Sequence, residues 1–349
     1  MVKMNEQAAF IMPAKLNGGE WELCHLMRTV AAIQQQTDTN WLLIIVDDFS
    51  DNEKVSAALD EIEARLKEKV HIIRLRKNVG TGAARNIAVS YANGIGAPFV
   101  LYNDSDDMPH PRWLETVRRK FAEDEKANVV YSSFDVIDEN DAPVPWENIC
   151  MPVREILMGH RKDVSEGENA WVSIAAKKNY TNLTSCTAVR TWLAAEEPFP
   201  AQTISEDTHA WLRYGAHPGK FVYVGDIKNR YRICSGRESR SRSQNADFYK
   251  IKTSVDQDGF EKAAELALRF GTVTPEEIPQ IRLAFYVRLG LSILYGGYEE
   301  GAAELIASAC RISKESTLEC IALLDCDTVY KNKLKEMMSF QQLRGDNGE

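Results

Sequence analysis

The stretch IIRLRKNVGTGAARNIAVSYANG, residues 72–94, joins a short apolar run to a helical pattern through Gly80 and Gly82. A strand, a glycine-rich turn and a helix in this order are typical of a dinucleotide-binding turn, in which phosphate lies at the helix N-terminus. The fingerprint G-x-G-x-x-G needs a third glycine for close contact between helix and strand, and Arg85 stands there instead. The stretch is therefore either an altered dinucleotide turn or a nucleotide site of another kind.

Apolar runs and helical patterns alternate on both sides of this stretch. The helical patterns repeat apolar residues at spacings of three and four, whereas the runs between them have the length of strands. This alternation predicts an α/β fold with a mostly parallel sheet flanked by helices. Ligands of such sheets bind beyond the carboxyl ends of the strands. Strands are expected at residues 8–13, 41–46, 70–75, 99–102, 129–134 and 221–224.

The second half of the chain has a different pattern. Residues 135–200 hold several prolines and an acidic, polar stretch, which indicate loops and a lid. From about residue 245 the pattern is helical. We expect a first domain over residues 1–243 and an all-α region over residues 244–349. The all-α region would serve acceptor binding, homo-oligomerisation or docking. Helices of that region are expected at residues 259–270, 275–297, 299–312 and 315–339.

The composition is that of a globular protein, with 44% hydrophobic and 27% charged residues among 349. The net charge of −9 argues against binding to nucleic-acid phosphates, so no nucleic-acid partner is expected. The seven cysteines form no C-x-x-C pair, which favours a reducing cytoplasm over disulfides or a zinc site. No stretch resembles a signal peptide or a membrane span. We expect a cytoplasmic protein without an integral membrane segment, either dissolved or peripheral at the inner membrane face.

Carboxylates cluster where two expected strands end and where a helix expected around residues 207–214 begins. Acids this close repel one another, so each cluster needs a cation, hydrogen-bond donors or solvent. Mg²⁺ typically takes one or two protein carboxylates together with phosphate oxygens and water. Helix capping is the alternative, because Asp and Ser are common N-cap residues and acids favour a helix's first turn. A dinucleotide ribose needs one carboxylate, whereas three follow the fourth strand, which opposes the dinucleotide alternative. The acids are Asp47, Asp48 and Asp51; Asp104, Asp106 and Asp107; and Glu206 with Asp207.

Six motifs in one order resemble the family 2 glycosyltransferases with a GT-A fold. The longest is N-x-G-x-x-x-A-R-N, which residues 78–86 match at every defined position. The resemblance covers about residues 7–242 and leaves the helical region outside. It implies a nucleotide-sugar site built from strand ends and loops. The other motifs are a P-x-Y-N-like turn at 13–17 with Lys15 in place of the aromatic residue and one extra residue before Asn17, V-D-D-x-S-x-D at 46–52 with Asp51 one residue early, D-x-D-D at 104–107 followed by Pro109, E-D at 206–207, and Y-R with a Ser/Arg-rich loop at 231–242.

The resemblance implies transfer of a hexosyl or N-acetylhexosaminyl group from a nucleoside diphosphate donor, expected to be UDP-linked. The acceptor would be a carbohydrate or another molecule with a hydroxyl group, and the anomeric carbon would be inverted. Asp207 would be the general base. Asp106 and Asp104 would bind Mn²⁺ or Mg²⁺, with Asp107 as an alternative ligand.

The resemblance also assigns residues to the nucleotide-sugar site. Asp48 would accept a hydrogen bond from the base, and Asp104 would contact the ribose or metal-bound water. Arg85 would project toward the base or the diphosphate. The remaining residues assigned to this site are Pro13, Ala14, Asn17, Asn78, Gly80, Ser105, Glu206, Arg237 and Arg240.

Two alternatives keep a related fold but change the activity. A sugar nucleotidyltransferase normally carries a glycine-rich turn after its first strand, where this chain has KLNGG at residues 15–19. A non-catalytic nucleotide- or sugar-binding module would have a degenerate site, and the intact set of acids argues against it. Five side chains have further expectations: Trp146 and Trp171 near an acceptor, Trp192 or Trp211 in the core, and His209 on a helix surface.

Overall fold

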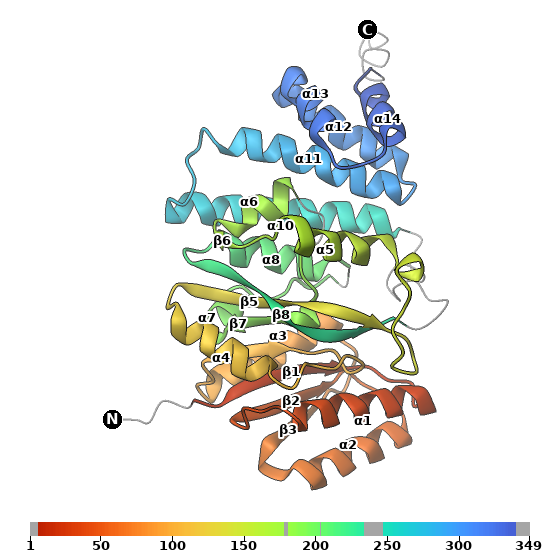
Figure 1. The fold of residues 1–349 in the computed structure, drawn as a ribbon, viewed down its shortest axis with the longest axis vertical. Coiled ribbons are helices and arrows are strands. Elements are labelled where there is room, and N and C mark those ends of the chain that lie inside the picture. Colours follow the sequence, from red (N-terminus) through yellow and green to blue (C-terminus); the bar gives the residue numbers. More distant parts are fainter. Residues whose placement is uncertain (1–5, 178–180, 203, 234–246, 340–349) are drawn as a thin grey trace.

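The structure is a computed structural model that describes residues 6–177, 181–202, 204–233 and 247–339. Its centre is an eight-stranded sheet in the order β3-β2-β1-β4-β7-β5-β8-β6 (Figure 1). The strands are β1 (Ala8–Ala14), β2 (Trp41–Asp47), β3 (Val70–Arg74), β4 (Phe99–Tyr102), β5 (Ala127–Ile137), β6 (Gly167–Glu168), β7 (Thr187–Arg190) and β8 (Lys220–Arg232).

Strands β1 to β4 form the parallel half of the sheet, as predicted. β1 pairs in parallel with β2 and β4, and β2 pairs in parallel with β3. Every residue of β1 and β2 is buried, as expected for parallel strands that are covered on both faces. The carboxyl ends of these strands share one edge, which places the chain after Asp47 beside the chain after Tyr102.

Helices cover both faces of the sheet because successive strand residues point to opposite sides. Phe10 belongs to the core shared with α1, α2 and α4, whereas Ile11 belongs to the core shared with α3, α6, α8 and α10. The helices are α1 (Glu20–Gln34), α2 (Glu53–Leu66), α3 (Thr81–Gly94), α4 (Trp113–Glu123), α5 (Met151–Lys162), α6 (Ala170–Ala176), α7 (Thr191–Glu196), α8 (Glu206–Ala216), α10 (Phe248–Phe270), α11 (Ile278–Tyr295), α12 (Glu299–Ile312), α13 (Lys314–Leu323) and α14 (Thr328–Ser339), with short 3₁₀ turns η1 (Lys67–Lys69), η2 (Trp146–Asn148) and η3 (Thr184–Cys186).

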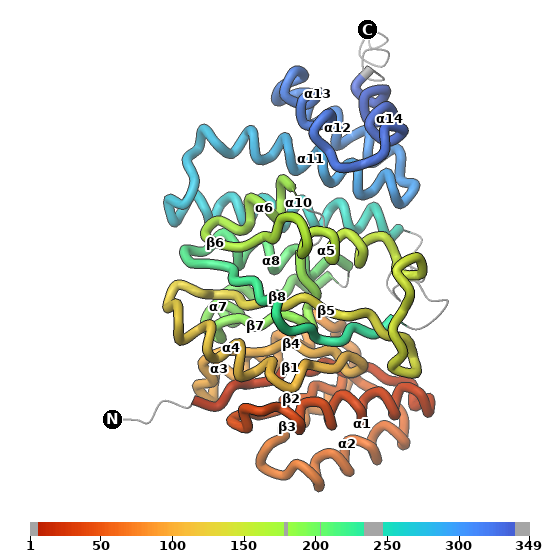
Figure 2. Tube along the Cα trace, viewed as in Figure 1, coloured from red at the N-terminus to blue at the C-terminus, as the bar shows by residue number. Residues whose placement is uncertain are grey.

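The C-terminal helices continue the molecule in layers away from the sheet. α10 packs against α8, α11 packs against α6, and α12 to α14 cover α11. Figure 2 follows this path from β3 at one end of the molecule to α13 at the other. One continuous apolar core joins the sheet to these helices. The helical region is therefore built onto the sheet domain. The boundary predicted between residues 243 and 244 lies outside the described residues and stays a prediction.

The predicted elements differ from the structure in several places, and the helix predicted at residues 259–270 begins earlier, at Phe248 of α10. The stretch predicted as loops and a lid contains α5, α6, α7 and the antiparallel strand β7, which lies between β4 and β5. The strand predicted at residues 221–224 is the start of the longer β8. The helix predicted at residues 315–339 is divided into α13 and α14. None of the described helices has the length and hydrophobicity to cross a membrane; the compartment stays a prediction.

The contact between α6 and α8 depends on Gly215. A Cβ atom at this position would lie 2.6 Å from the backbone nitrogen of Trp171. We expect Gly215→Ala to lower the free energy of unfolding by about 2 kcal/mol, because the clash outweighs the gain in helix propensity. Gly159→Ala in α5 is the matched control, since no atom lies within 4 Å of its added Cβ. Gly159→Ala should raise the free energy of unfolding by up to about 1 kcal/mol. Urea denaturation measures both, and equal effects would contradict the prediction.

Candidate active site

The ends of β1 and β2 form one wall of the site. The backbone N–H of Asp48 donates to the carbonyl oxygen of Ala14 at 2.8 Å, and Ser50 Oγ accepts from the N–H of Leu16 at 2.9 Å. The amide of Asn52 donates to the carbonyl of Asn17 at 3.0 Å. Pro13, the remaining predicted residue here, is buried within β1. Helix capping, the alternative use of Asp47, Asp48 and Asp51, is not seen at α2, whose N-cap residue is Asn52.

Asp48 holds the glycine-rich turn in place. Its two carboxylate oxygens accept from the N–H groups of Val79 and Gly80, at 2.7 and 2.9 Å. Gly80 has a φ of 89°, a conformation that favours glycine, and it precedes the first residue of α3. Asn78 donates weakly to the carbonyl of Asp48, at 3.5 Å. Asp48 therefore has a structural use for both oxygens, and its predicted contact with a nucleotide base stays a prediction.

The turn after β4 presents the second group of acids. Asp104, Ser105 and Asp106 are partly exposed, and the N–H of Asp104 donates to Ser185 Oγ at 2.9 Å. Asp107 is buried and accepts from the backbone N–H of Arg232 at 2.8 Å. Burial, together with the charges of Asp106 and Asp104, raises the pKa of Asp107 well above its usual range. Asp107 thus ties the turn to β8, while the predicted metal ligands Asp104 and Asp106 lie nearer to solvent.

Arg85 connects two of the acidic groups. Its guanidinium donates to Asp104 Oδ1 at 2.7 Å and to Glu206 Oε1 at 3.2 Å, and only 4% of its side chain is exposed. Burial opposes the charge of Arg85, but Asp104 and Glu206 more than offset this and raise its pKa. The residue that replaces the third glycine therefore binds carboxylates. A direct contact with a nucleotide stays a prediction.

The loop before α8 is fastened to α3 beside Arg85. The Asn86 amide exchanges hydrogen bonds with the backbone of Phe199, at 2.9 and 2.8 Å, and the Phe199 ring lies under the Arg85 guanidinium. A Cβ on Gly82 would lie 3.2 Å from the Phe199 Cβ. Because Gly82 has no side chain, this loop can pack closely against α3. The motif identified Asn86, but sequence reasoning assigned it no function.

The first turn of α8 carries the third group of acids. Ser205, which precedes the helix, has a φ of 59°. Burial first, and then the charge of Asp207, raise the pKa of Glu206 to about 7. Burial also raises the pKa of Asp207, opposed by the N–H of Thr208 and by Arg85. A carboxylate with a raised pKa can take up a proton near neutral pH, which is what a general base does.

The burial of four tryptophans and of His209 tests the predictions made for these side chains. Trp211 is in the core, as predicted for one of two tryptophans, and Trp192 is exposed. Trp171 is fully buried against Phe260, so its predicted position near an acceptor is wrong. His209 is also buried, because α10 covers α8 where a helix surface was predicted. Trp146 is partly exposed. Arg237 and Arg240 lie outside the described residues.

Sequence reasoning missed a charge pair on α10, Lys252 and Asp256, which bonds to Ser205. A signal was available, because both residues fall on the same stripe as the buried Val255 and Gly259. Charged residues on the apolar stripe of a helix are candidates for a buried network.

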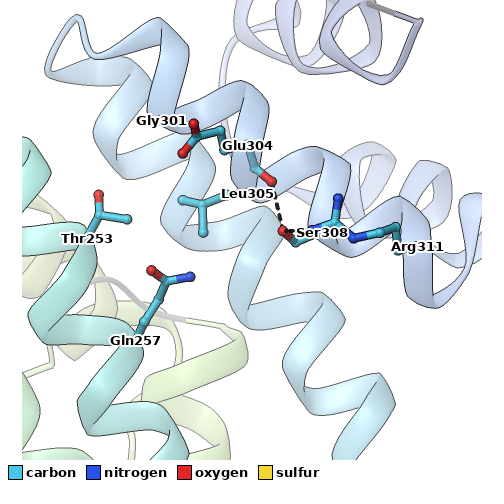
Figure 3. A pocket seen from close by; sticks show the side chains of 7 residues that line it. All are labelled: Thr253, Gln257, Gly301, Glu304, Leu305, Ser308 and Arg311. Atoms are coloured by element: carbon cyan, nitrogen blue, oxygen red, sulfur yellow. Dashed lines mark hydrogen bonds between the residues drawn. The ribbon is translucent and has the colours of Figure 1, made fainter. Parts of the chain in front are cut away.

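A groove between α10 and α12 has a volume of about 260 Å³ and lies in the helical region (Figure 3). None of the residues predicted for the site lines it. Within it, Arg311 donates to Ser308 Oγ, which in turn donates to the Glu304 carbonyl. The groove and the acids around Arg85 are therefore separate features.

A profile of known protein families matches residues 12–177, and the family is described as glycosyl transferase family 2. These residues, just under half of the chain, are similar to that family. The matched range includes the glycine-rich turn, Asp48, Arg85 and the turn after β4, whereas α8 and the C-terminal helices follow it. The predicted resemblance to family 2 glycosyltransferases is thereby confirmed over residues 12–177.

Two curated proteins similar to this chain differ in how much of their own length the chain covers. The mouse (Mus musculus) polypeptide N-acetylgalactosaminyltransferase 15 is 36% identical over 207 residues, which are 58% of this chain and 29% of that protein. The chain thus spans less than a third of that relative. An uncharacterized glycosyltransferase of Methanocaldococcus jannaschii, MJ1057, is 29% identical over 230 residues, 66% of this chain and 73% of that protein.

Solved structures confirm the GT-A fold with its helical extension. A crystal structure of S. aureus TarS in complex with UDP-GlcNAc aligns with a TM-score of 0.61 at 16% identity, covering 97% of this chain and 92% of that chain. The mannosyltransferase PcManGT from Pyrobaculum calidifontis, in complex with GDP-Man and Mn²⁺, aligns with a TM-score of 0.53 at 15% identity, covering 98% and 88%. The C-terminal helices lie within these alignments, although they lie outside the family match.

Proposed function

We propose that the chain transfers a sugar from a nucleoside diphosphate donor to an acceptor hydroxyl, with inversion and with Asp207 as the general base. The observation that carries this proposal is the pair of hydrogen bonds from Arg85 to Asp104 and Glu206. They bring the acids after β4 and the acids of α8 to one place beyond the carboxyl ends of the parallel strands. This edge is where α/β sheets bind their ligands.

The proposed reaction needs a base on one side of the sugar and a stabilised leaving group on the other. The acceptor oxygen bonds to the anomeric carbon while its proton passes to the Asp207 carboxylate. The bond from that carbon to the diphosphate oxygen breaks, and its electron pair leaves with the diphosphate. Attack from the face opposite the diphosphate inverts the anomeric carbon. The raised pKa of Asp207 supports its role as the proton acceptor.

We propose Mn²⁺ or Mg²⁺ as the cofactor, held by Asp106 and Asp104. The residues fit such an ion, because burial first, and then the like charges of Asp106 and Asp104, raise the pKa of Asp107, and a cation would offset those charges. Among the described residues, no three acidic, histidine or cysteine side chains are placed to hold an ion alone. This suits Mn²⁺ and Mg²⁺ that take donor phosphate oxygens as further ligands. When bound, the ion would offset charge on the leaving diphosphate.

A UDP-linked N-acetylhexosamine is the proposed donor. The mouse relative is named as an N-acetylgalactosaminyltransferase, and the S. aureus TarS structure holds UDP-GlcNAc. The P. calidifontis structure holds GDP-Man instead, so a guanosine donor is the alternative to test. For the acceptor we propose a carbohydrate or another hydroxyl compound. The helical region would bind it, form a homo-oligomer or dock a partner.

Calorimetric titration with UDP, GDP, CDP and dTDP tests the donor site, each with Mn²⁺ and again with excess chelator. We expect UDP to bind in the presence of Mn²⁺, and Asp106→Ala to weaken this binding at least about tenfold, because a metal ligand is lost. Asp325→Ala in the helical region is the control, since its side chain is 94% exposed. Equal affinity in wild type and Asp106→Ala would contradict the assignment of Asp106 as a ligand.

Turnover separates the two alternatives. A non-catalytic binding module would bind UDP with Mn²⁺ but release no UDP from any UDP-sugar. A sugar nucleotidyltransferase would exchange pyrophosphate into its nucleotide sugar. We expect UDP release from a UDP-sugar and no pyrophosphate exchange.

A further inference from the structure

A buried ion pair in the helical region lies directly beneath the first turn of α8. Lys252 Nζ and Asp256 Oδ2 are 2.7 Å apart on successive turns of α10, and 2% and 1% of their side chains are exposed. Ion pairs this deeply buried add little net stability, because removing both charges from water is costly. The position of this pair therefore calls for an explanation other than stability.

The pair forms hydrogen bonds with Ser205, the residue that precedes Glu206 and Asp207 at the start of α8. Ser205 Oγ donates to Asp256 Oδ1 at 2.5 Å and accepts from Lys252 Nζ at 3.1 Å. Ser205 has a φ of 59°, in the left-handed region that a serine rarely adopts. Such a conformation persists only where the surroundings hold it. The two hydrogen bonds of the Ser205 hydroxyl are the contacts that hold its side chain.

Two further contacts fix α10 against the same turn of α8. His209 Nε2 lies 2.8 Å from Asp258 Oδ2. A Cβ on Gly259 would lie 3.0 Å from the Cα of His209, so the two helices approach closely there. Contacts from α10, a helix outside the range that matches the family, therefore help to set the position of the α8 first turn, together with the bond from Arg85 to Glu206.

We propose that Lys252 and Asp256 are positioning residues for the base Asp207. They fix the orientation of the Asp207 side chain because they hold Ser205 in its left-handed conformation. This inference rests on the proposed function, in which Asp207 takes the acceptor proton. It gives the helical region a part in the reaction. The two residues need not touch the substrate, because they act through the backbone of Ser205.

The charges around Asp207 give the proposal a distinctive signature. Arg85 from α3 and Lys252 from α10 lower the pKa of Asp207, Asp256 raises it, and Glu206 titrates beside it. Loss of Lys252 should therefore move the acid limb of a kcat/KM profile to higher pH, and loss of Asp256 should move it to lower pH. A change that lowered stability without altering the charges beside Asp207 would move neither limb.

The test compares Lys252→Met and Asp256→Asn with wild type in UDP release from the donor. We expect kcat to fall about 10- to 100-fold, as for a misplaced catalytic group, while KM for the donor stays within about threefold. The acid limbs should move in opposite directions. Lys262→Met is the matched control, since Lys262 forms an i,i+4 pair with Asp258 on the same helix but is 51% exposed. If both variants behave like Lys262→Met, the proposal is overturned.

Hydrogen exchange separates this proposal from the proposed function. Amides of residues 204–210 should exchange about tenfold faster in Lys252→Met and Asp256→Asn than in wild type or Lys262→Met. If the wild-type chain releases no UDP but the exchange rates change, the proposed function fails and the hold on Ser205 stands. Unchanged exchange in an active enzyme overturns the inference. If the single variants do not fold, Lys252→Met/Asp256→Leu replaces both charges by apolar groups, and it must show the same loss of kcat and faster exchange.

Discussion

Asp207→Asn should abolish transfer while leaving the donor site intact. We expect kcat to fall about 10³-fold, within the range that a general base contributes, because the amide cannot take the acceptor proton. The affinity for UDP with Mn²⁺ should stay within a few-fold of wild type. Donor hydrolysis gives a measurement that needs no acceptor, since water must lose a proton to the same base.

The pH dependence of wild type belongs to the same prediction. Because burial raises the pKa of Asp207, the carboxylate takes up a proton at a higher pH than an ordinary aspartate. Activity should therefore fall as the pH drops through this raised pKa, and Asp207→Asn should lack that limb. Asp60→Asn on α2 is the control, since its side chain is 67% exposed. An Asp207→Asn enzyme with wild-type kcat would show that another group is the base.

The parallel half of the fold was predictable because its strands are covered on both faces and so read as unbroken apolar runs. The antiparallel strand β7 was missed because its four residues, Thr187–Arg190, form no such run. Its place in the sheet is set by pairing with β4 and β5, which no local pattern reports. The division of the last predicted helix at residues 324–327 was missed as well.

The grouping of the candidate residues was predictable where they follow strand ends, and it was missed where it depends on contacts between distant segments. The positions of Asp48 and Asp104 follow from the ends of β2 and β4. The bond from Arg85 to Glu206 joins residues 121 positions apart, so the sequence could assign both to a site without showing that they meet. His209 was predicted on a helix surface and Lys252 was missed for the same reason, because the packing of α10 on α8 decides the surroundings of both residues.

Arg85→Met should be among the most destabilising single changes in this chain. Removing the guanidinium leaves Asp104 and Glu206 without their shared cation. Breaking a buried pair typically costs 3–5 kcal/mol. We expect a loss of about 3 kcal/mol in the free energy of unfolding, at the low end because 34% of the Asp104 side chain is exposed. Urea denaturation at pH 7 measures it.

The loss of unfolding free energy in Arg85→Met should grow as the pH rises. The pKa of Glu206 is raised from 4.5 to about 7 in the folded chain, so the folded state binds this proton more tightly than the unfolded state does. Stability from this group is therefore greatest below pH 4.5 and falls as the pH rises toward 7. Arg85 lowers the pKa of Glu206, so Arg85→Met should raise it further and extend the decline. The variant should lose more stability at pH 8 than at pH 6.

Arg74→Met provides the matched control for Arg85→Met. Arg74 also pairs with two carboxylates, Asp60 and Glu63, but 36% of its side chain is exposed and its partners lie on the surface of α2. Exposed ion pairs of this kind contribute up to about 1 kcal/mol. The two variants therefore remove the same charge and differ in burial. If they lost equal stability, or if the loss in Arg85→Met were independent of pH, the buried network around Arg85 would not be what joins α3, the turn after β4 and α8.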